Sequence, residues 1–147
     1  MAALSSETVH ATSVAIDGRG VLILGASGAG KSDLALRLID RGAILVSDDY
    51  TIATVRDGAL RLNPPANIAG RMEVRHLGLV DAPYVEDVEA VLAIRLEDNP
   101  ARMPEEFPII VLAGIALPVI ALAGLEASAP VKVELALRHL PRLMGSA

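Results

Sequence analysis

The chain has 147 residues, a formal net charge of −5 and no cysteine. This length fits one folded domain, and the acidic balance argues against nucleic acid as the main partner. The lack of cysteine excludes a disulfide scaffold, a zinc–thiolate site and a cysteine nucleophile. The acidic, cysteine-free composition predicts a cytoplasmic protein, and residues 1–12 lack the basic start and apolar run of a signal peptide.

Two short apolar segments near the start predict a β-hairpin. Residues 9–16 and 21–24 flank Asp17-Gly18-Arg19-Gly20, whose composition is typical of a tight turn. His10 falls in the first of these segments. A histidine in such a strand is either simply hydrogen-bonded or available for proton or phosphate handling.

The most specific motif is Gly25-Ala-Ser-Gly-Ala-Gly-Lys-Ser32, between the second strand and a helix predicted over residues 31–41. Its G-x-x-x-x-G-K-S spacing predicts a P-loop. Glycines let consecutive backbone N–H groups approach a polyphosphate, Lys31 would reach the β and γ phosphates, and Ser32 would bind Mg²⁺. The predicted nucleotide-binding residues are Gly25, Ala26, Ser27, Gly28, Ala29, Gly30, Lys31 and Ser32.

A glycine at position 42 ends the helix, and a short apolar strand over residues 43–46 leads to Asp48-Asp49. The order strand, loop, helix, strand is typical of an α/β nucleotide-binding core. We expect the strand 43–46 to lie next to the P-loop strand, with Asp48 and Asp49 at the ligand-binding edge of the sheet. One carboxylate would then face the metal and the other the acceptor hydroxyl, or the pair only makes a turn.

Short strands follow. Residues 51–56 and 59–62 flank Asp57-Gly58, the clearest hairpin turn of the chain. Residues 71–75 read Arg-Met-Glu-Val-Arg, and their period of two would place Arg71, Glu73 and Arg75 on one strand face. That arrangement is either a Mg²⁺ ligand between phosphate-binding arginines or an exposed charged face.

The last third of the chain is apolar. Residues 88–96 predict a strand, which a polar turn over residues 97–106 follows. The uncharged stretch 107–125 has the length of a membrane span, but two prolines and two glycines divide it into runs at 109–113 and 115–122. These breaks favour two buried strands. Residues 130–143 predict a helix with Pro130 in its first turn and Val133, Leu137 and Leu140 on one face.

Together, Val9-His10, the P-loop and the blocks at residues 41–49 and 72–80 resemble the catalytic domain of HPr kinase/phosphorylase. This bacterial enzyme phosphorylates a serine of the phosphocarrier protein HPr. The resemblance covers nearly the whole chain. It implies an α/β fold with a P-loop core and a strand-rich mixed sheet, similar to HPr kinase and phosphoenolpyruvate carboxykinase, in a single kinase domain over residues 1–147.

The resemblance also implies roles for individual residues. Asp49 matches the aspartate that takes the serine proton, and Asp48 lies beside it at the nucleotide. The other implied site residues are His10 and Arg102 as active-site groups, Lys31 as the P-loop lysine, and Ser32 with Glu73 as Mg²⁺ ligands. The implied cofactors are ATP and Mg²⁺. The implied partner is HPr or a nitrogen-branch paralogue, and the implied assembly is a homo-oligomer, a hexamer in the family.

Three departures from the family pattern refine this expectation. The chain begins almost at the catalytic core, as in the short forms of alphaproteobacteria, and His76 replaces a glycine of the family's E-x-R-G-L-G block. The proline-glycine-arginine-asparagine stretch associated with dephosphorylation has no counterpart around residues 128–134. We therefore predict kinase activity without phosphorolysis.

The sequence leaves two alternative functions. One is a P-loop kinase for a small metabolite, and the other is a nucleotide-binding regulatory module without catalysis. A GTPase is disfavoured because no guanine-reading motif is present.

Overall fold

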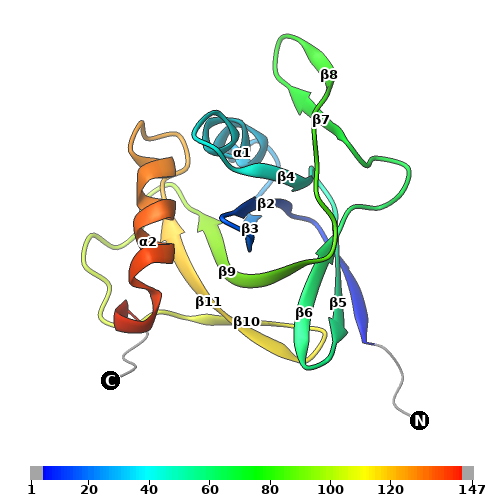
Figure 1. Ribbon diagram of the computed structural model, residues 1–147. Helices are drawn as coiled ribbons and strands as arrows, with labels where there is room; N and C mark the ends of the chain where they lie inside the picture. Colours follow the sequence, from blue (N-terminus) through cyan, green and yellow to red (C-terminus); the bar gives the residue numbers. More distant parts are fainter. Residues whose placement is uncertain (1–4, 144–147) are drawn as a thin grey trace.

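The computed structural model describes residues 5–143 and consists of a curled sheet, two helices and a projecting hairpin (Figure 1). In chain order the elements are β1 (Ser6–Val9), β2 (Thr12–Ile16), β3 (Arg19–Leu24), α1 (Lys31–Asp40), β4 (Ile44–Ser47), β5 (Thr51–Arg56), β6 (Ala59–Asn63), β7 (Arg71–Val74), β8 (Gly78–Asp81), β9 (Val88–Leu96), β10 (Ile109–Leu112), β11 (Ile115–Leu122) and α2 (Ala129–Leu143). The α/β fold class with a strand-rich sheet is confirmed.

The strand β9 connects the two halves of the sheet. The main order is β1-β5-β6-β9-β3-β2-β4, with β11 also pairing with β9, and β10 with β11. Along one edge, β9 runs parallel to β3. Along the other edge it pairs with β6 near its start and with β11 near its end. Because one strand serves both halves, the sheet curls instead of lying flat.

Four strands point the same way and bring their carboxyl ends to one edge of the sheet. β3, β9 and β11 are parallel, and β4 shares their direction because β2 is antiparallel to both β3 and β4. The expected pairing of β4 with the P-loop strand is wrong, because β2 lies between them. Strand β2 pairs with β3 through their hairpin and occupies the edge of β3 that β4 would otherwise use.

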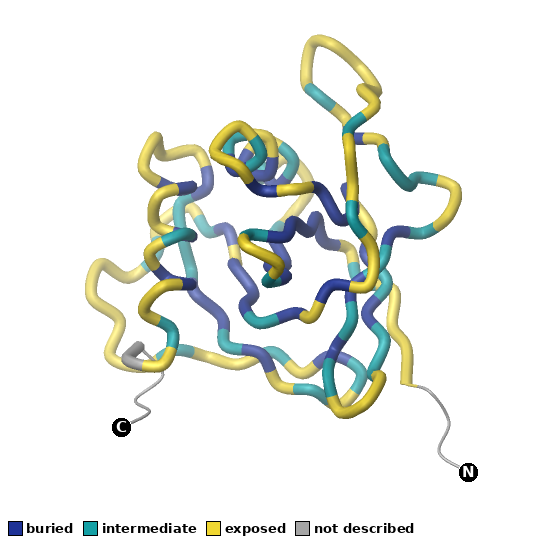
Figure 2. Tube along the Cα trace, in the orientation of Figure 1, coloured by how far each residue is buried: buried dark blue, intermediate teal, exposed yellow. Residues whose placement is uncertain are grey.

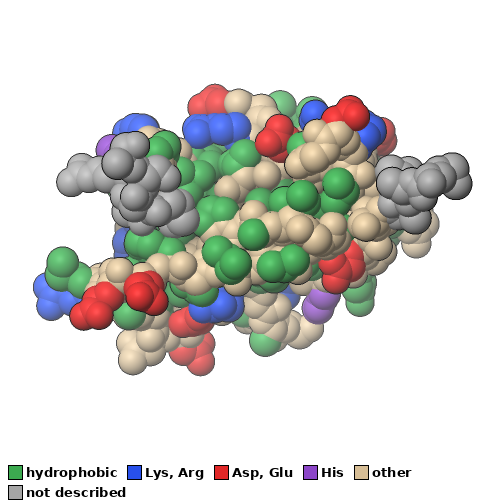
Figure 3. Space-filling view, turned by 90° about the horizontal axis from the view of Figure 1, so that it is seen from below, with side chains coloured by type: hydrophobic (Ala, Val, Ile, Leu, Met, Phe, Trp, Pro, Cys, Tyr) green, Lys and Arg blue, Asp and Glu red, His purple; other side chains and the backbone are tan. Residues whose placement is uncertain are grey.

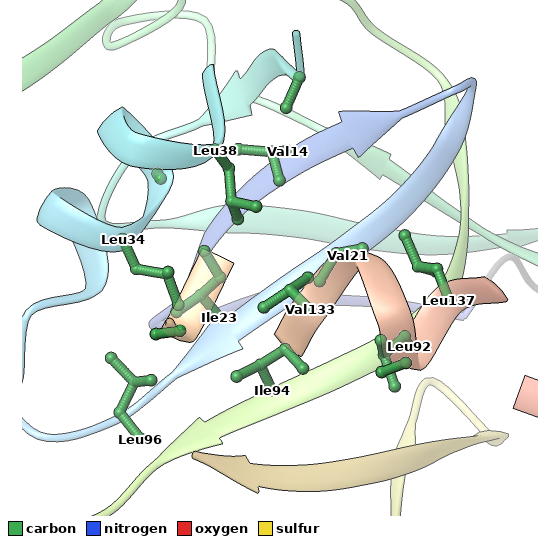
Figure 4. Close-up of a cluster of buried hydrophobic side chains, with 14 of the residues drawn as sticks. Val14, Val21, Ile23, Leu34, Leu38, Leu92, Ile94, Leu96, Val133 and Leu137 are labelled. Atoms are coloured by element: carbon green, nitrogen blue, oxygen red, sulfur yellow. The ribbon is translucent and has the colours of Figure 1, made fainter. Parts of the chain in front are cut away.

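Successive apolar side chains of the central strands point to opposite faces of the sheet, so a hydrophobic core forms on each face. Val21 and Ile23 of β3 pack with Leu92 and Ile94 of β9 against both helices (Figure 4). Leu22 between them faces the opposite core, which the curled half of the sheet encloses. Figure 2 shows this burial along the central strands and the exposure of the β7–β8 hairpin.

The two helices pack on the same core and contact each other. α1 buries Leu34 and Leu38, and α2 buries Val133 and Leu137. An ion pair of 2.7 Å joins Arg41, directly after α1, to Glu134 of α2, and this carboxylate raises the pKa of the Arg41 guanidinium. The helix predicted over residues 130–143 is confirmed.

The apolar stretch 107–125 forms two antiparallel strands, β10 and β11, as predicted. Within residues 5–143, no helix has the length and apolar character needed to cross a bilayer. Figure 3, seen from below in the orientation of Figure 1, shows hydrophobic side chains gathered over this face. The exposed side chains of β10 include Ile109 and Val111.

Two predicted strands need correction. Residues 9–16 form two strands, not one, because the chain bends at His10 and Ala11, where the Ala11 amide bonds back to the Val9 carbonyl at 2.9 Å. β7 ends at Val74, so Arg75 lies beyond the strand and does not share its face with Arg71 and Glu73. The partner strand β8 was not predicted.

Candidate active site

The P-loop lies between the end of β3 and the start of α1. Gly28 and Gly30 take positive φ angles of 84° and 98°, which side-chain-bearing residues adopt only at a cost. Gly30 is the residue before α1, and no side chain caps the helix. The first N–H groups of α1 have no intrahelical acceptor, and with the positive end of the helix dipole they form an anion-binding concavity.

Neighbouring elements hold the loop from two sides. A Cβ added at Gly25 would lie 3.2 Å from the Leu96 Cβ, at the end of β9. A Cβ added at Gly30 would lie 2.9 Å from the Leu125 Cδ2, in the segment after β11. Larger residues at either position would push the loop away from these supports.

Lys31 is directed back over the loop. Its Nζ donates hydrogen bonds to the carbonyl oxygens of Gly25 at 2.7 Å and Ala26 at 3.1 Å, and the residue is only 8% exposed. An ammonium has three donors, so one N–H remains for an anion in the concavity.

Asp48 is the centre of a hydrogen-bond network from three elements. Its Oδ1 accepts from the Ser32 hydroxyl at 2.6 Å and from the Thr12 hydroxyl at 3.0 Å. Its Oδ2 accepts from the backbone N–H of Glu73 at 2.9 Å. The residue is 6% exposed, and such donors offset the cost of burying a carboxylate. The network fixes α1, β2 and β7 around one carboxylate.

The oxygen atoms of the side chains around Asp48 are suitable ligands for a Mg²⁺ ion. Ser32 uses its hydroxyl proton toward Asp48, so the lone pairs of its Oγ remain available for a cation. Asp48 and Glu73 also line a cavity of about 110 Å³ together with Arg71 and Asn67. Oxygen ligands suit Mg²⁺, which keeps several waters and phosphate oxygens. Among residues 5–143, no cluster of three or more histidine, cysteine or acidic side chains could hold a metal by itself.

Asp49 projects outward from the same turn. Its backbone has a positive φ of 70°, and its N–H donates to the Thr12 hydroxyl at 3.1 Å. A hydrogen bond of 2.9 Å joins the His10 Nε2 to the Asp49 Oδ1, with side chains 43% and 61% exposed. The His10 ring stacks on Tyr50, with centroids 5.0 Å apart. The two adjacent carboxylates therefore face different environments, one buried and one open.

The remaining predicted site residues lie elsewhere. Arg102 is exposed in the segment after β9 and lines a second cavity, between residues 98–108, β11 and α2. Asp48 and Glu73 do not line that cavity. His76 is exposed in the β7–β8 turn with a positive φ of 76°.

Sequence reasoning missed two residues of this site, Thr12 and Tyr50. Thr12 links Asp48 to the backbone of Asp49. The ring of Tyr50 supports His10. A threonine at a strand start and a tyrosine after a turn carry no motif, so only the folded arrangement identifies them.

Comparison with known proteins agrees with this architecture. The family model of the HPr serine kinase C-terminal domain matches residues 2–95. The HPr kinase/phosphorylase of Clostridium novyi is 44% identical over 92 residues, which are 62% of this chain and 30% of the relative. That of Clostridium tetani is 42% identical over 93 residues, which are 63% of this chain and 30% of the relative. The match thus spans under a third of these curated relatives.

Among solved structures, the HPr(Ser) kinase/phosphatase from Coxiella burnetii is similar over nearly the whole chain. The TM-score is 0.80 at 29% sequence identity, and the match covers 92% of this chain and 91% of that chain. The likeness therefore extends beyond residues 2–95 to β10, β11 and α2.

Proposed function

This chain belongs to the HPr serine kinase C-terminal domain family, and we propose that it is an ATP-dependent kinase that phosphorylates a serine of an HPr-like phosphocarrier protein in the cytoplasm. One observation carries the proposal. The part-buried Ser32–Asp48 pair at the P-loop and the open Asp49–His10 pair follow one another at the same edge of the sheet. A phosphate-binding group and a candidate proton acceptor are thereby adjacent.

At the phosphate side, the loop amides and Lys31 would bind the terminal phosphates of ATP. The Ser32 hydroxyl would hold Mg²⁺, with Glu73 as a second ligand and Asp48 orienting the hydroxyl. When bound, Mg²⁺ neutralises charge on the phosphate oxygens. Phosphoryl transfer depends mostly on such positioning and charge stabilisation, which the buried network around Asp48 supports.

At the acceptor side, the Asp49 carboxylate would take the proton of the serine hydroxyl. The serine oxygen forms a bond to the γ-phosphorus, the bond from that phosphorus to the bridging oxygen of ADP breaks, and ADP leaves. His10 bonds to the Oδ1 of Asp49, so Oδ2 remains for the substrate proton. His10 thus holds the carboxylate in one orientation.

The exposure of this pair favours a protein acceptor over a small metabolite. Metabolite pockets usually enclose about 300–1,000 Å³, but the cavity next to Asp48 measures about 110 Å³, and neither Asp48 nor Asp49 lines the wider groove beside β11 and α2. An open carboxylate instead suits a serine presented on the surface of another protein. A regulatory module without catalysis would not require a free carboxylate beside the phosphate loop.

The test is to incubate the protein with γ-labelled ATP, Mg²⁺ and either HPr or its nitrogen-branch paralogue, followed by mass spectrometry of the carrier. We expect phosphoserine on one of the two carriers. Binding of ATP without transfer to either carrier would support the regulatory module, and transfer only to a metabolite in a substrate screen would support the small-metabolite kinase.

A further inference from the structure

A wide groove is separate from the Asp48 site. It measures about 940 Å³ and lies between residues 98–108, β11 and α2. Its volume falls in the range that holds a drug-sized ligand. The mechanism proposed above uses the loop, Asp48 and Asp49, but leaves this groove without a role.

The position of the groove relates it to the P-loop. Asp98 and Asn99, after β9, and Ala123 and Glu126, after β11, line one end. β9 is the neighbour of β3, and both β9 and β11 run parallel to it. This end of the groove therefore lies at the same sheet edge as the phosphate loop, where ligands of α/β sheets bind.

The groove and the acceptor side lie on opposite sides of the P-loop strand. β2 and β4, which carry Thr12 and lead to Asp49, flank β3 on one side, and β9 flanks it on the other. In phosphoryl transfer the attacking and leaving oxygens are roughly in line. If the serine approaches from the Asp49 side, the ADP leaving group must point away from it, toward β9 and β11.

Specific contacts hold the segment directly after β11, residues 124–126, against α1, β9 and the phosphate loop. Arg37 of α1 donates to the carbonyl oxygens of Glu126, at 2.9 Å, and Gly124. Gly124 packs so closely on Leu96 that an added Cβ would lie 2.8 Å from its Cδ1. Leu125 lies against Gly30 and is nevertheless 71% exposed. The Leu125 side chain thus lies against the loop, and the next residue, Glu126, lines the groove.

The lining suits a nucleoside. Its apolar wall includes Phe107, Ile120 and Leu122, against which a base can pack. The Asn99 amide offers a donor and an acceptor, the pattern that pairs with the edge of adenine. A carboxylate at a strand end, such as Asp98, suits ribose hydroxyls.

We propose that this groove binds the purine nucleoside part of the nucleotide whose phosphates bind the P-loop. The assignment rests on the proposed function, because it requires a nucleotide at the loop. It adds the part of the molecule that distinguishes ATP from inorganic polyphosphate.

The chain has no tryptophan, so a single introduced indole reports on the groove. In Phe107→Trp, we expect ATP and ADP with Mg²⁺ to change the emission, whereas tripolyphosphate with Mg²⁺ leaves it unchanged although it binds. Val111→Trp, on the exposed face of β10 and outside the groove, serves as control and should respond to none of them. An identical response of Phe107→Trp to ATP and tripolyphosphate would overturn the assignment.

A second variant tests affinity without a reporter. Ala123→Leu narrows the end of the groove next to the loop, and calorimetry should show at least about tenfold weaker ATP binding with unchanged tripolyphosphate binding. Unchanged affinity for both ligands would overturn the groove assignment and leave the proposed function standing. Failure of the unaltered protein to bind either ligand would overturn both.

Discussion

The Ser32 hydroxyl donates a hydrogen bond of 2.6 Å to the Asp48 carboxylate, although the strands that lead to these two residues are not neighbours in the sheet. β2 lies between β3 and β4, and its Thr12 donates to the same carboxylate oxygen. The intervening strand thus completes the network that connects the P-loop helix to the acidic turn.

Asp48→Asn should destabilise the fold and weaken Mg²⁺-dependent nucleotide binding. Three donors point at the two oxygens of the buried carboxylate, and an amide would present its NH₂ to at least one of them. We expect a loss of about 1–3 kcal/mol in the free energy of unfolding, measured by urea denaturation. Asp57→Asn, exposed in the β5–β6 turn, is the control and should leave both properties unchanged. A variant as stable as the unaltered protein would contradict the network.

Asp49→Asn should abolish transfer while nucleotide binding stays nearly unchanged. Asparagine tolerates the positive φ of this position, and the side chain is exposed, so the fold should persist. Loss of a general base lowers the rate by about 100-fold or more, which a labelled-phosphate assay can follow beside calorimetry with ATP. Full transfer by this variant would exclude Asp49 as the base.

Thr12→Val should lower kcat for transfer with little change in KM for ATP. Valine keeps the shape of the buried side chain but removes the bonds to the Asp48 carboxylate and the Asp49 amide. We expect about 1–2 kcal/mol lower stability, and Thr12→Ser should retain both hydrogen bonds and most of the rate.

The matched control for Thr12 is Thr54→Val, which removes the hydroxyl hydrogen bond to Ser6 between β1 and β5, outside the acidic turn. This control should leave the rate unchanged. If both valine variants lower the rate equally, the effect of Thr12 is not specific to the acidic turn.

Gly28→Ala should weaken phosphate binding more than its backbone strain alone explains. Gly28 and Gly58 have positive φ angles of 84° and 75°, and an added Cβ at either meets no atom within 4 Å. Both alanine variants should therefore lose about 1–2 kcal/mol of stability. Only at Gly28 would the methyl group crowd a bound phosphate, so calorimetry with tripolyphosphate should separate the two. Equal affinities would contradict the assigned role of the loop.

Short-range sequence patterns predict the phosphate loop and several of the strands around it. Glycine spacing and the Lys31-Ser32 pair specify a P-loop by themselves, and the alternation in residues 88–96 specifies a strand at the bounds observed for β9. Asp57-Gly58 specifies the turn of its hairpin. Each of these signals depends on neighbours in the sequence.

The remaining features depend on partners far along the chain. Residues 9–16 have a continuous strand-like composition, yet at their bend the Ala11 carbonyl accepts a hydrogen bond of 2.9 Å from the Thr51 hydroxyl, far along the chain. The position of β2 beside β4, and with it the role of Thr12, follows from sheet order. Sheet order is a tertiary property that no local pattern encodes.

The shared strand β9 also has a consequence for the order of assembly. β3, which leads into the phosphate loop, receives its second neighbour only from residues about seventy positions later, as in the pair Leu22 and Ala93. Such distant pairings form slowly because a long loop must close first. During synthesis on the ribosome, the first third of the chain therefore emerges with its glycine-rich loop unsupported. Nucleotide affinity should arise only after β9 has been added, and the amides of β9 should be among the slowest to exchange with solvent deuterium.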